Sequence, residues 1–240
     1  MRLDKALSLA GFSRTKSKKL IAEGRVSVCG TPLRDPGAEV ALEGIALDGK
    51  ELLLEEELYL MMNKPAGVLT ATEDARLPTV VSLLPEALQR RKPGPVGRLD
   101  KDVTGLVLLT TDGVLAHRLI SPRFKAEKLY RAVCEGVPDE KDIAAFAGGI
   151  ELKDFTAKPA LLRVLSSDEE TAVAEAVLSE GKYHQVKRMF AAIGHPLRSL
   201  ERRRIGCVTL DETLAPGEYR RLTSDEIHGL KQLVGLEETI

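Results

Sequence analysis

The sequence contains no tryptophan, and aromatic residues make up only 4% of its 240 residues. A hydrophobic core must therefore come mainly from Leu, Val, Ile and Ala. The three cysteines, Cys29, Cys134 and Cys207, lie far apart, which predicts neither a disulfide framework nor a zinc site and favours a reducing compartment. No apolar run approaches the roughly 18 residues of a membrane helix. The N-terminal residues 1–5 carry an acid and do not resemble a secretory signal. We expect a cytoplasmic globular protein without a membrane partner.

The formal net charge is only −1, but the charges are separated along the chain. Residues 1–34 contain eight Lys or Arg and two acids, whereas residues 35–58 contain one Lys and eight acids. Residues 88–131 and 182–204 are again basic, with ten cations against four acids and seven against one. Such runs can be ordinary solvated surface, but together they favour a basic face that attracts nucleic-acid phosphates.

The first 34 residues predict two short helices and a hairpin. Apolar residues recur at helical spacing from Leu3 to Ala10, and Ser13 is a candidate N-cap for a second, basic helix that ends at Gly24. Residues 26–28 alternate as a strand and Cys29-Gly30 suits a turn. The acidic stretch that follows predicts strand and linker. We therefore expect two domains, residues 1–58 and residues 59–240.

The second domain shows alternating strand and helix signals. A buried strand is expected from residue 58 to 62, leading into a loop at residues 63–67, and another at residues 106–109. Asp112 can cap a helix that covers residues 114–120. Further elements are expected as a strand at 129–134, a hairpin around 164 and 172–178, and a last clear helix at 183–193 that Gly194 closes.

Asp100 is the strongest candidate for chemistry. Its carboxylate lies between Arg98 and Lys101, just before an apolar strand, and a nearby cation would keep it ionised even when partly buried. A desolvated carboxylate can act as a nucleophile toward a sugar or an electrophilic ring carbon. A solvated turn residue explains the same pattern, and spacing alone favours that reading. Asp102 points the same way on an extended segment and could form a glycosidase-like pair with Asp100.

Basic residues form the other candidates. His184, Lys187 and Arg188 share a helix face and could grip phosphate or pair with a catalytic acid. The run at residues 202–204 could contact RNA or be solvated. No histidine has a metal-ligand spacing, and no glycine-rich phosphate loop is present, so we expect no metal and no cofactor.

The segment at residues 97–106, Gly-Arg-Leu-Asp-Lys-Asp-Val-Thr-Gly-Leu, resembles the catalytic motif of pseudouridine synthases that act on ribosomal RNA. Three further stretches resemble that family's motifs in the same order: residues 62–67 with 77–80, residues 128–130, and residues 181–190. The first 34 residues resemble the small RNA-binding module of ribosomal protein S-four. This pairing is most similar to the subgroup that modifies small-subunit (16S) RNA, although relatives that modify large-subunit (23S) RNA share the layout.

The resemblance implies an α+β fold, with a small N-terminal α/β RNA-binding module and a catalytic domain built on a mixed, mainly antiparallel sheet. It implies that Asp100 is the nucleophile, that Tyr130 packs against the target base, and that Lys187 is the basic partner. The family often carries Arg in that place, and an ammonium lacks the bidentate fork of a guanidinium. The residues expected to bind RNA are Arg2, Lys5, Arg14, Lys16, Lys18, Lys19, Arg25, Lys64, Arg98, His184 and Arg188.

The expected function is therefore the isomerisation of a specific uridine in small-subunit RNA, or in an assembly intermediate, by a monomeric enzyme that flips the base. Two alternatives remain open at this point: a synthase for large-subunit RNA, and a non-catalytic RNA-binding factor in ribosome assembly. A carboxylate-based glycoside hydrolase is disfavoured because the chain lacks Trp and has few aromatic stacking platforms.

Overall fold

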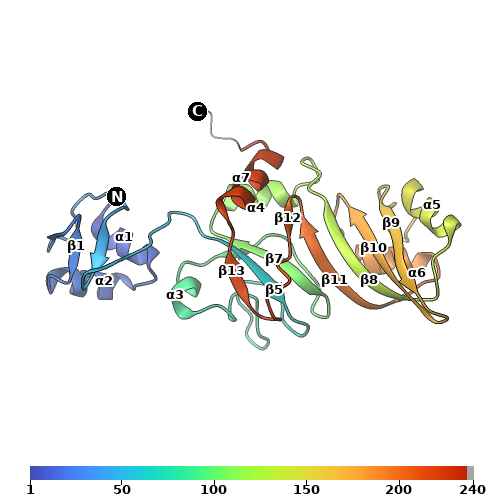
Figure 1. The fold of residues 1–240 in the computed structure, drawn as a ribbon, viewed down its shortest axis with the longest axis horizontal. Helices are drawn as coiled ribbons and strands as arrows, with labels where there is room; N and C mark the ends of the chain where they lie inside the picture. The colour runs from blue at the N-terminus through green and yellow to red at the C-terminus, as the bar shows by residue number, and fades with distance from the viewer. Residues whose placement is uncertain (237–240) are drawn as a thin grey trace. The chain divides into compact units, whose positions relative to one another are not determined.

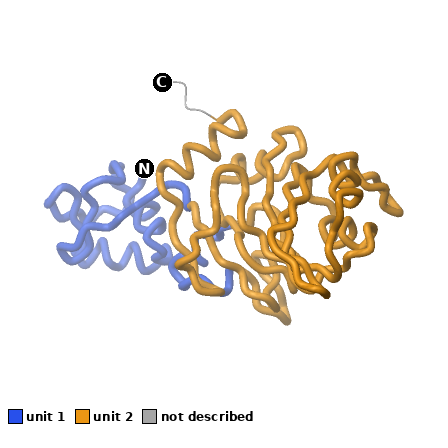
Figure 2. Tube along the Cα trace, turned by 45° about the vertical axis from the view of Figure 1, so that its right-hand side comes forward, with its two compact units in different colours: residues 1–58, 81–93 blue, residues 59–80, 94–240 orange. Residues whose placement is uncertain are grey.

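The computed structural model describes residues 1–236 and divides the chain into two compact units (Figure 2). One unit comprises residues 1–58 and 81–93, and the other comprises residues 59–80 and 94–240. Residues 81–93 thus return to the N-terminal unit, although the expected boundary lay at residue 58. There Gly11 lies so close to Ala87 that a Cβ on Gly11 would be 2.5 Å from the Ala87 Cβ, and Arg91 donates to the carbonyl oxygens of Glu55 and Glu56.

The N-terminal unit has the predicted helices and hairpin. α1 spans Leu3–Leu9 and α2 spans Arg14–Ala22, where the Ser13 side chain accepts a hydrogen bond from the Lys16 N–H at 3.3 Å and so confirms the predicted cap. An antiparallel sheet of order β2-β1-β3-β4 follows, and residues 81–93 add the short helix α3. The bounds are Val26–Val28 for β1, Thr31–Pro32 for β2, Ile45–Leu47 for β3, Lys50–Glu51 for β4 and Glu86–Gln89 for α3.

Aliphatic side chains form the core of this unit. The helices contribute Leu3, Leu7 and Ile21, and the sheet contributes Val26 and Ile45, all fully buried. The helical residues recur at i, i+3 or i+4, so each helix buries one face and leaves its cations on the other.

The second unit is built on one mixed sheet (Figure 1). Its order is β13-β5-β7-β11-β8-β10-β9, with β12 beside β11 and β6 beside β7. The β11–β7 pair is parallel and the other pairs are antiparallel, as predicted for the catalytic domain. The strands are β5 Tyr59–Lys64, β6 Gly94–Pro95, β7 Thr104–Thr110, β8 Lys128–Glu135, β9 Leu161–Ser167, β10 Thr171–Leu178, β11 Leu197–Ile205, β12 Val208–Thr209 and β13 Tyr219–Arg221.

Four helices accompany this sheet: α4 Gly113–Ile120, α5 Glu140–Gly148, α6 Gln185–Ala192 and α7 Ser224–Leu233. The expected cap of α4 is present, since Asp112 accepts from the Leu115 N–H at 2.9 Å. The expectation that the helix at 183–193 is the last one was wrong. α7 follows it and begins with a capping box in which Thr223 and Glu226 satisfy each other's backbone N–H groups. No helix within the described residues is both long and apolar enough to cross a bilayer.

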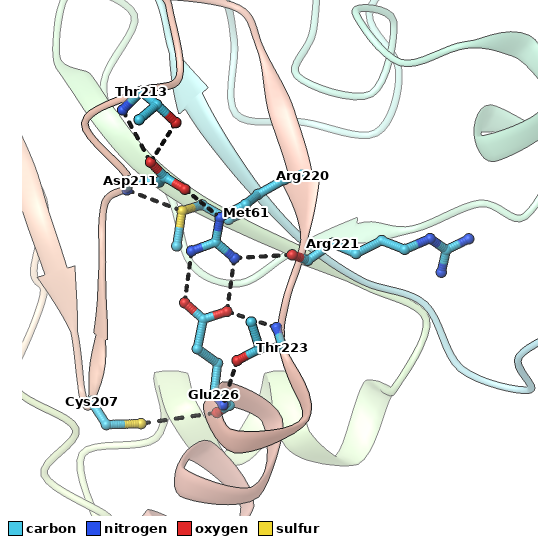
Figure 3. Close-up of polar contacts among 8 residues, drawn as sticks. All are labelled: Met61, Cys207, Asp211, Thr213, Arg220, Arg221, Thr223 and Glu226. Carbon is cyan, nitrogen blue, oxygen red and sulfur yellow. Dashed lines mark hydrogen bonds and ion pairs between the residues drawn. The ribbon is translucent and has the colours of Figure 1, made fainter.

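A polar network joins β13 to α7 and to the segment after β12 (Figure 3). The Arg220 guanidinium donates to the Asp211 carboxylate at 2.7 Å and to both Glu226 oxygens at 2.8 Å. Glu226 therefore serves α7 twice, as the third residue of its capping box and as the partner of Arg220. The network ties the C-terminal helix to the edge of the sheet.

Candidate active site

Asp100 lies between β6 and β7 in a segment that is fastened to a neighbouring loop. The Leu99 N–H donates to the Thr70 hydroxyl at 3.1 Å, and this hydroxyl donates to the Leu99 carbonyl at 2.9 Å. The Gly67 N–H donates to the Lys101 carbonyl at 2.8 Å. Leu99 is buried, whereas the Asp100 side chain keeps 29% of its surface exposed. The segment therefore anchors its leucine in the interior and presents its carboxylate to the exterior.

Lys64, the last residue of β5, supports the same segment from inside the protein. Its side chain is fully buried. The ammonium donates to three carbonyl oxygens, those of Val103 at 2.7 Å, Pro65 at 3.1 Å and Lys101 at 3.2 Å. Burial lowers the pKa of Lys64 to about 8, against the opposing effect of nearby carboxylates. The predicted RNA contact of Lys64 needs correction, because a side chain without exposed surface cannot reach a phosphate.

Two basic side chains face Asp100 across the site. The Lys187 Nζ lies 3.1 Å from one carboxylate oxygen of Asp100, and the His184 Nε2 lies 3.4 Å from the other. Lys187 belongs to the first turn of α6, while His184 precedes the helix with a φ of 49°, in the left-handed region. The helix therefore begins two residues later than Tyr183, where the sequence pattern had placed it. This turn carries the imidazole to the carboxylate.

Asp102 is a second partner of Lys187. Its two oxygens accept from the Lys187 ammonium at 2.7 and 2.9 Å, although 75% of the Asp102 side chain is exposed. Burial acts to lower the pKa of Lys187, but the hydrogen bonds to Asp102 and Asp100 more than offset this and raise it. The Lys187 hydrogen bond in turn lowers the pKa of Asp102. The two aspartates thus keep one lysine cationic between them.

An open pocket of about 70 Å³ lies next to this charge cluster. Tyr130 of β8 is one of its walls and is buried, with its backbone paired to β10 and β11. The pocket brings together the three predicted catalytic residues, Asp100, Tyr130 and Lys187. Its further lining residues are Arg98, Leu99, Val103, Leu178, Glu180, Gly181, Lys182, His184, Gln185, Val186 and Leu200.

Glu180 and Gln185 were missed by the sequence analysis. Both are buried beside the pocket, and the Gln185 amide donates to Glu180 Oε1 at 2.6 Å. The same Glu180 oxygen accepts from the Lys158 N–H, and the side-chain Oε1 of Gln185 accepts from the Lys182 N–H. These bonds hold the turn that positions His184 and Lys187. The available signal was polar residues on both sides of a glycine where an apolar strand leads into a helix.

The remaining predicted basic residues differ in their surroundings. Arg98 is exposed and lines the pocket. Arg188 instead forms an ion pair with Asp154, so it does not join the Asp100 cluster. Arg202, treated above as part of a surface run, is buried and donates to the Leu106 carbonyl at 2.8 Å.

The cations predicted in the N-terminal unit are all exposed. Two of them pair with acids of the same unit: Arg2 with Asp4 at 3.1 Å and Arg25 with Asp48. Lys19 lies 3.8 Å from Glu23. Among residues 1–236, no carboxylate lies within ion-pair distance of the four other cations, Lys5, Arg14, Lys16 and Lys18. These four are the best placed to meet phosphates.

Comparison with known proteins gives two family matches. The family described as RNA pseudouridylate synthase matches residues 58–192. The S4 domain matches residues 1–44.

Individual relatives cover almost the whole chain. An uncharacterised RNA pseudouridine synthase of Bacillus subtilis is 42% identical over 97% of this chain and 99% of its own length. The ribosomal small subunit pseudouridine synthase A of Escherichia coli is 43% identical over 95% of this chain and 98% of its own length. A crystal structure of a pseudouridylate synthase is 39% identical, covers 96% of this chain and 99% of that one, and superposes with a TM-score of 0.67.

Proposed function

This chain belongs to the RNA pseudouridylate synthase family, and we propose that it converts a specific uridine of small-subunit ribosomal RNA to pseudouridine with Asp100 as the nucleophile. The reaction breaks the bond between the uracil nitrogen and the ribose, rotates the base and forms a carbon–carbon bond through C5 of the ring. The C5 proton is released and the nitrogen regains one, so the product is an isomer of the substrate. No electrons are exchanged with a second reactant.

The observation that carries this proposal is the ion pair between Asp100 and Lys187 at the mouth of a pocket walled by Tyr130. A nucleophilic carboxylate must be charged and accessible, and the Asp100 carboxylate is partly exposed with the Lys187 ammonium 3.1 Å away. The raised pKa of Lys187 keeps that ammonium charged at neutral pH. Tyr130 presents an aromatic wall against which a uracil ring can pack.

A stacked uridine cannot reach this carboxylate. The target nucleotide must leave the helix and enter the pocket, which costs a few kcal/mol of unstacking. Phosphate contacts can supply the free energy that offsets this cost. The exposed cations of the N-terminal unit and Arg98 at the pocket are the groups that we assign to this task.

The choice of small-subunit RNA rests on the relatives. The Escherichia coli relative, and one of Salmonella typhimurium at the same 43% identity, are named ribosomal small subunit pseudouridine synthase A. Both match 95% of this chain, so the N-terminal module and the catalytic domain are shared together.

The test is the release of tritium from RNA labelled at C5 of uridine. Unmodified small-subunit and large-subunit transcripts, and partly assembled small-subunit particles, are compared. Asp100→Asn is the matched variant, because the amide nearly preserves the shape of the acid. We expect release from the small-subunit substrate, none with Asp100→Asn, and RNA binding by that variant within a few-fold of the wild type.

Other outcomes would change the proposal in defined ways. Release from large-subunit RNA alone would keep the chemistry and replace the substrate. Tritium release that persists in Asp100→Asn would show that Asp100 is not the nucleophile. Tight RNA binding with no release from any substrate would favour a non-catalytic assembly factor.

A further inference from the structure

Tyr183 exposes an aromatic ring in a protein that has few of them. Its side chain is 74% exposed, while the other Tyr and Phe residues, all of which lie in the described part of the chain, are buried or partly buried. A tyrosine ring is largely apolar, and stacking on a nucleobase is a common use of such a ring at a protein surface. Tyr183 lies next to the candidate catalytic groups, so a nucleobase stacked on it would lie close to the reacting uridine.

One face of this ring already has a partner. The Tyr183 and His184 rings are stacked, with centroids 3.8 Å apart and planes inclined by 19°. The same imidazole lies 3.4 Å from the Asp100 carboxylate. The high exposure of Tyr183 leaves the ring face opposite the imidazole open to solvent. The two rings thus form a short column that starts at the nucleophile and ends at an exposed aromatic face.

Hydrogen bonds hold the backbone that carries this column. His184 has a φ of 49°, in the left-handed region that non-glycine residues adopt uncommonly. The buried Glu180–Gln185 pair and the hydrogen bond from the Lys182 N–H to Gln185 supply that hold. The held backbone and the stack on His184 together favour one orientation of the Tyr183 ring, which lowers the entropy lost when a flat ligand stacks on it.

The Tyr183 end of the column lies outside the pocket, while its His184 end lines it. Lys182 and His184, on either side of Tyr183, line the pocket, whereas Tyr183 is not among the described residues that do so. A base stacked on Tyr183 is therefore a different base from the one beside Tyr130. Lys182, which precedes Tyr183 in the chain, is exposed, and its ammonium lies 3.9 Å from the Phe155 ring centroid, so it offers a cation for a phosphate of the same strand.

We propose that the Tyr183–His184 stack is a second nucleobase subsite, which holds a base adjacent in the RNA strand to the flipped uridine. This inference rests on the proposed function, because it takes the strand to be one whose target nucleotide occupies the pocket. Stacking tolerates any base, so the subsite contributes affinity and position rather than sequence selection. The bound base would stack on Tyr183, which stacks on His184, and the His184 imidazole lies next to Asp100.

The absence of tryptophan makes a direct test possible. Tyr183→Trp would introduce the only tryptophan in the chain, and stacking of a base on its indole quenches its fluorescence. The control is Val137→Trp, at an exposed position beyond the end of β8 that is remote from Tyr130. The probes are an unmodified small-subunit RNA transcript, a short oligouridylate, and an oligomer of the same length made of abasic ribose phosphate.

In Tyr183→Trp we expect the transcript and the oligouridylate to quench the indole fluorescence and the abasic oligomer to quench it little. In Val137→Trp we expect little change with any probe. Equal quenching of Tyr183→Trp by the abasic oligomer would mean that phosphates, not bases, approach this face, and would overturn the subsite. Unchanged fluorescence of Tyr183→Trp at RNA concentrations that saturate binding would overturn it as well.

A second measurement uses RNA affinity. Tyr183→Ala should weaken binding by about five-fold or more, Tyr183→Phe should retain the wild-type affinity, and the slope of affinity against salt should be unchanged in both. Lys182→Ala should instead lower that slope. Wild-type affinity in Tyr183→Ala would contradict the inference. If RNA quenches Tyr183→Trp but the wild type releases no tritium from any substrate, the stacking subsite stands and the proposed reaction falls.

Discussion

Lys187 contacts two carboxylates that differ in exposure. Asp102 is mostly exposed to solvent, and both of its oxygens accept from the Lys187 ammonium. Asp100 is less exposed, and one of its oxygens lies 3.1 Å from the same ammonium. Solvent screens the exposed pair more strongly, so the enclosed pair carries more of the electrostatic interaction. We interpret Asp102 as a positioning residue that keeps Lys187 charged and near Asp100.

Asp102→Asn tests this interpretation through pH. The hydrogen bond to Asp102 helps to raise the pKa of Lys187, so its loss should lower that pKa. Lysine is charged only below its pKa, and the decline of kcat/KM on the alkaline side should therefore begin at lower pH in the variant. The measurement is initial tritium release between about pH 8 and about pH 11.5, a window that spans the range above the ordinary lysine pKa of about 10.4.

Asp154→Asn is the matched control, because Asp154 pairs with Arg188 and not with Lys187. Its alkaline limb should coincide with that of the wild type. If the alkaline limb of Asp102→Asn also coincided with that of the wild type, Asp102 would have no role in keeping Lys187 charged.

At the scale of elements, the site depends on how β5 supports the segment before β7. Lys64 ends β5 and donates to carbonyls on both sides of Asp102, within the segment that carries Asp100. Without Lys64 the Val103 carbonyl would lose this donor, and losing the partner of a buried polar group costs about 1–3 kcal/mol. The Lys101 carbonyl would keep the Gly67 N–H. The buried ammonium therefore fixes the backbone on which the nucleophile depends.

Lys64→Met should reduce turnover while leaving RNA affinity nearly unchanged. The thioether fills similar space but donates no hydrogen bonds, so the Asp100 segment can shift, and small displacements of a reacting group can cost about tenfold or more in rate. Single-turnover tritium release and RNA titration on the same preparation measure the two quantities. If the RNA affinity of Lys64→Met fell in parallel with its turnover, Lys64 would contribute to RNA binding after all.

The network around Arg220 predicts an acid-dependent stability. Hydrogen bonds from Thr213 and then from Arg220 lower the pKa of Asp211 to about 2, and Arg220 also lowers the pKa of Glu226. Carboxyls whose pKa is lower in the folded state stabilise it above their unfolded value of about 4, and this contribution disappears as the pH falls toward about 2. We expect Arg220→Met to be less stable than the wild type at pH 7.

The difference in unfolding free energy between the wild type and Arg220→Met should shrink as the pH falls from about 4 to about 2. The wild type then loses the carboxylate interactions that the variant already lacks. Urea denaturation at several pH values in this window measures it. A difference that stays constant with pH would show that Arg220 acts through packing and not through its carboxylate partners.

At the scale of the molecule, most of the cations predicted to bind RNA and the proposed chemistry belong to separate units. On the N-terminal unit, no carboxylate of residues 1–236 lies within ion-pair distance of Lys5, Arg14, Lys16 or Lys18, and the charge cluster around Asp100 lies on the second unit. Deletion of residues 1–58 would be a poor test of this division, since residues 81–93 pack within the N-terminal unit and would lose their partners. Point changes on the exposed face of α2 avoid that problem.

Replacing both Lys16 and Lys18 by Ala should weaken RNA binding and lower the salt slope by about two, one for each phosphate contact. Turnover at saturating RNA should remain at the wild-type level, because neither residue lies in the Asp100 pocket. Filter binding across a salt series and single-turnover kinetics measure these effects. An unchanged slope would remove this face from the RNA interface.

Much of the fold could be predicted because its signals are local. The first two helices, the Ser13 and Asp112 caps and several strands of the mixed sheet follow from side-chain periodicity and from residues that bond to their own backbone. The helix over Ser224–Leu233 was overlooked although Thr223 and Glu226 form a capping box, a local signal that was present in the sequence. The start of α6 was placed two residues too early, because the left-handed conformation of His184 interrupts the helix and the spacing of apolar residues does not register it.

The sequence by itself determined the composition of the core, the separation of charge and the motifs that brought Asp100, Tyr130 and Lys187 to attention. Only the tertiary structure decided which charges meet. It buried Lys64 and Arg202, which the sequence presents as ordinary basic residues, and it paired Arg188 with an aspartate other than Asp100. The physical reason is that burial and ion pairing depend on distances between residues that are far apart in the chain, and periodicity describes only near neighbours.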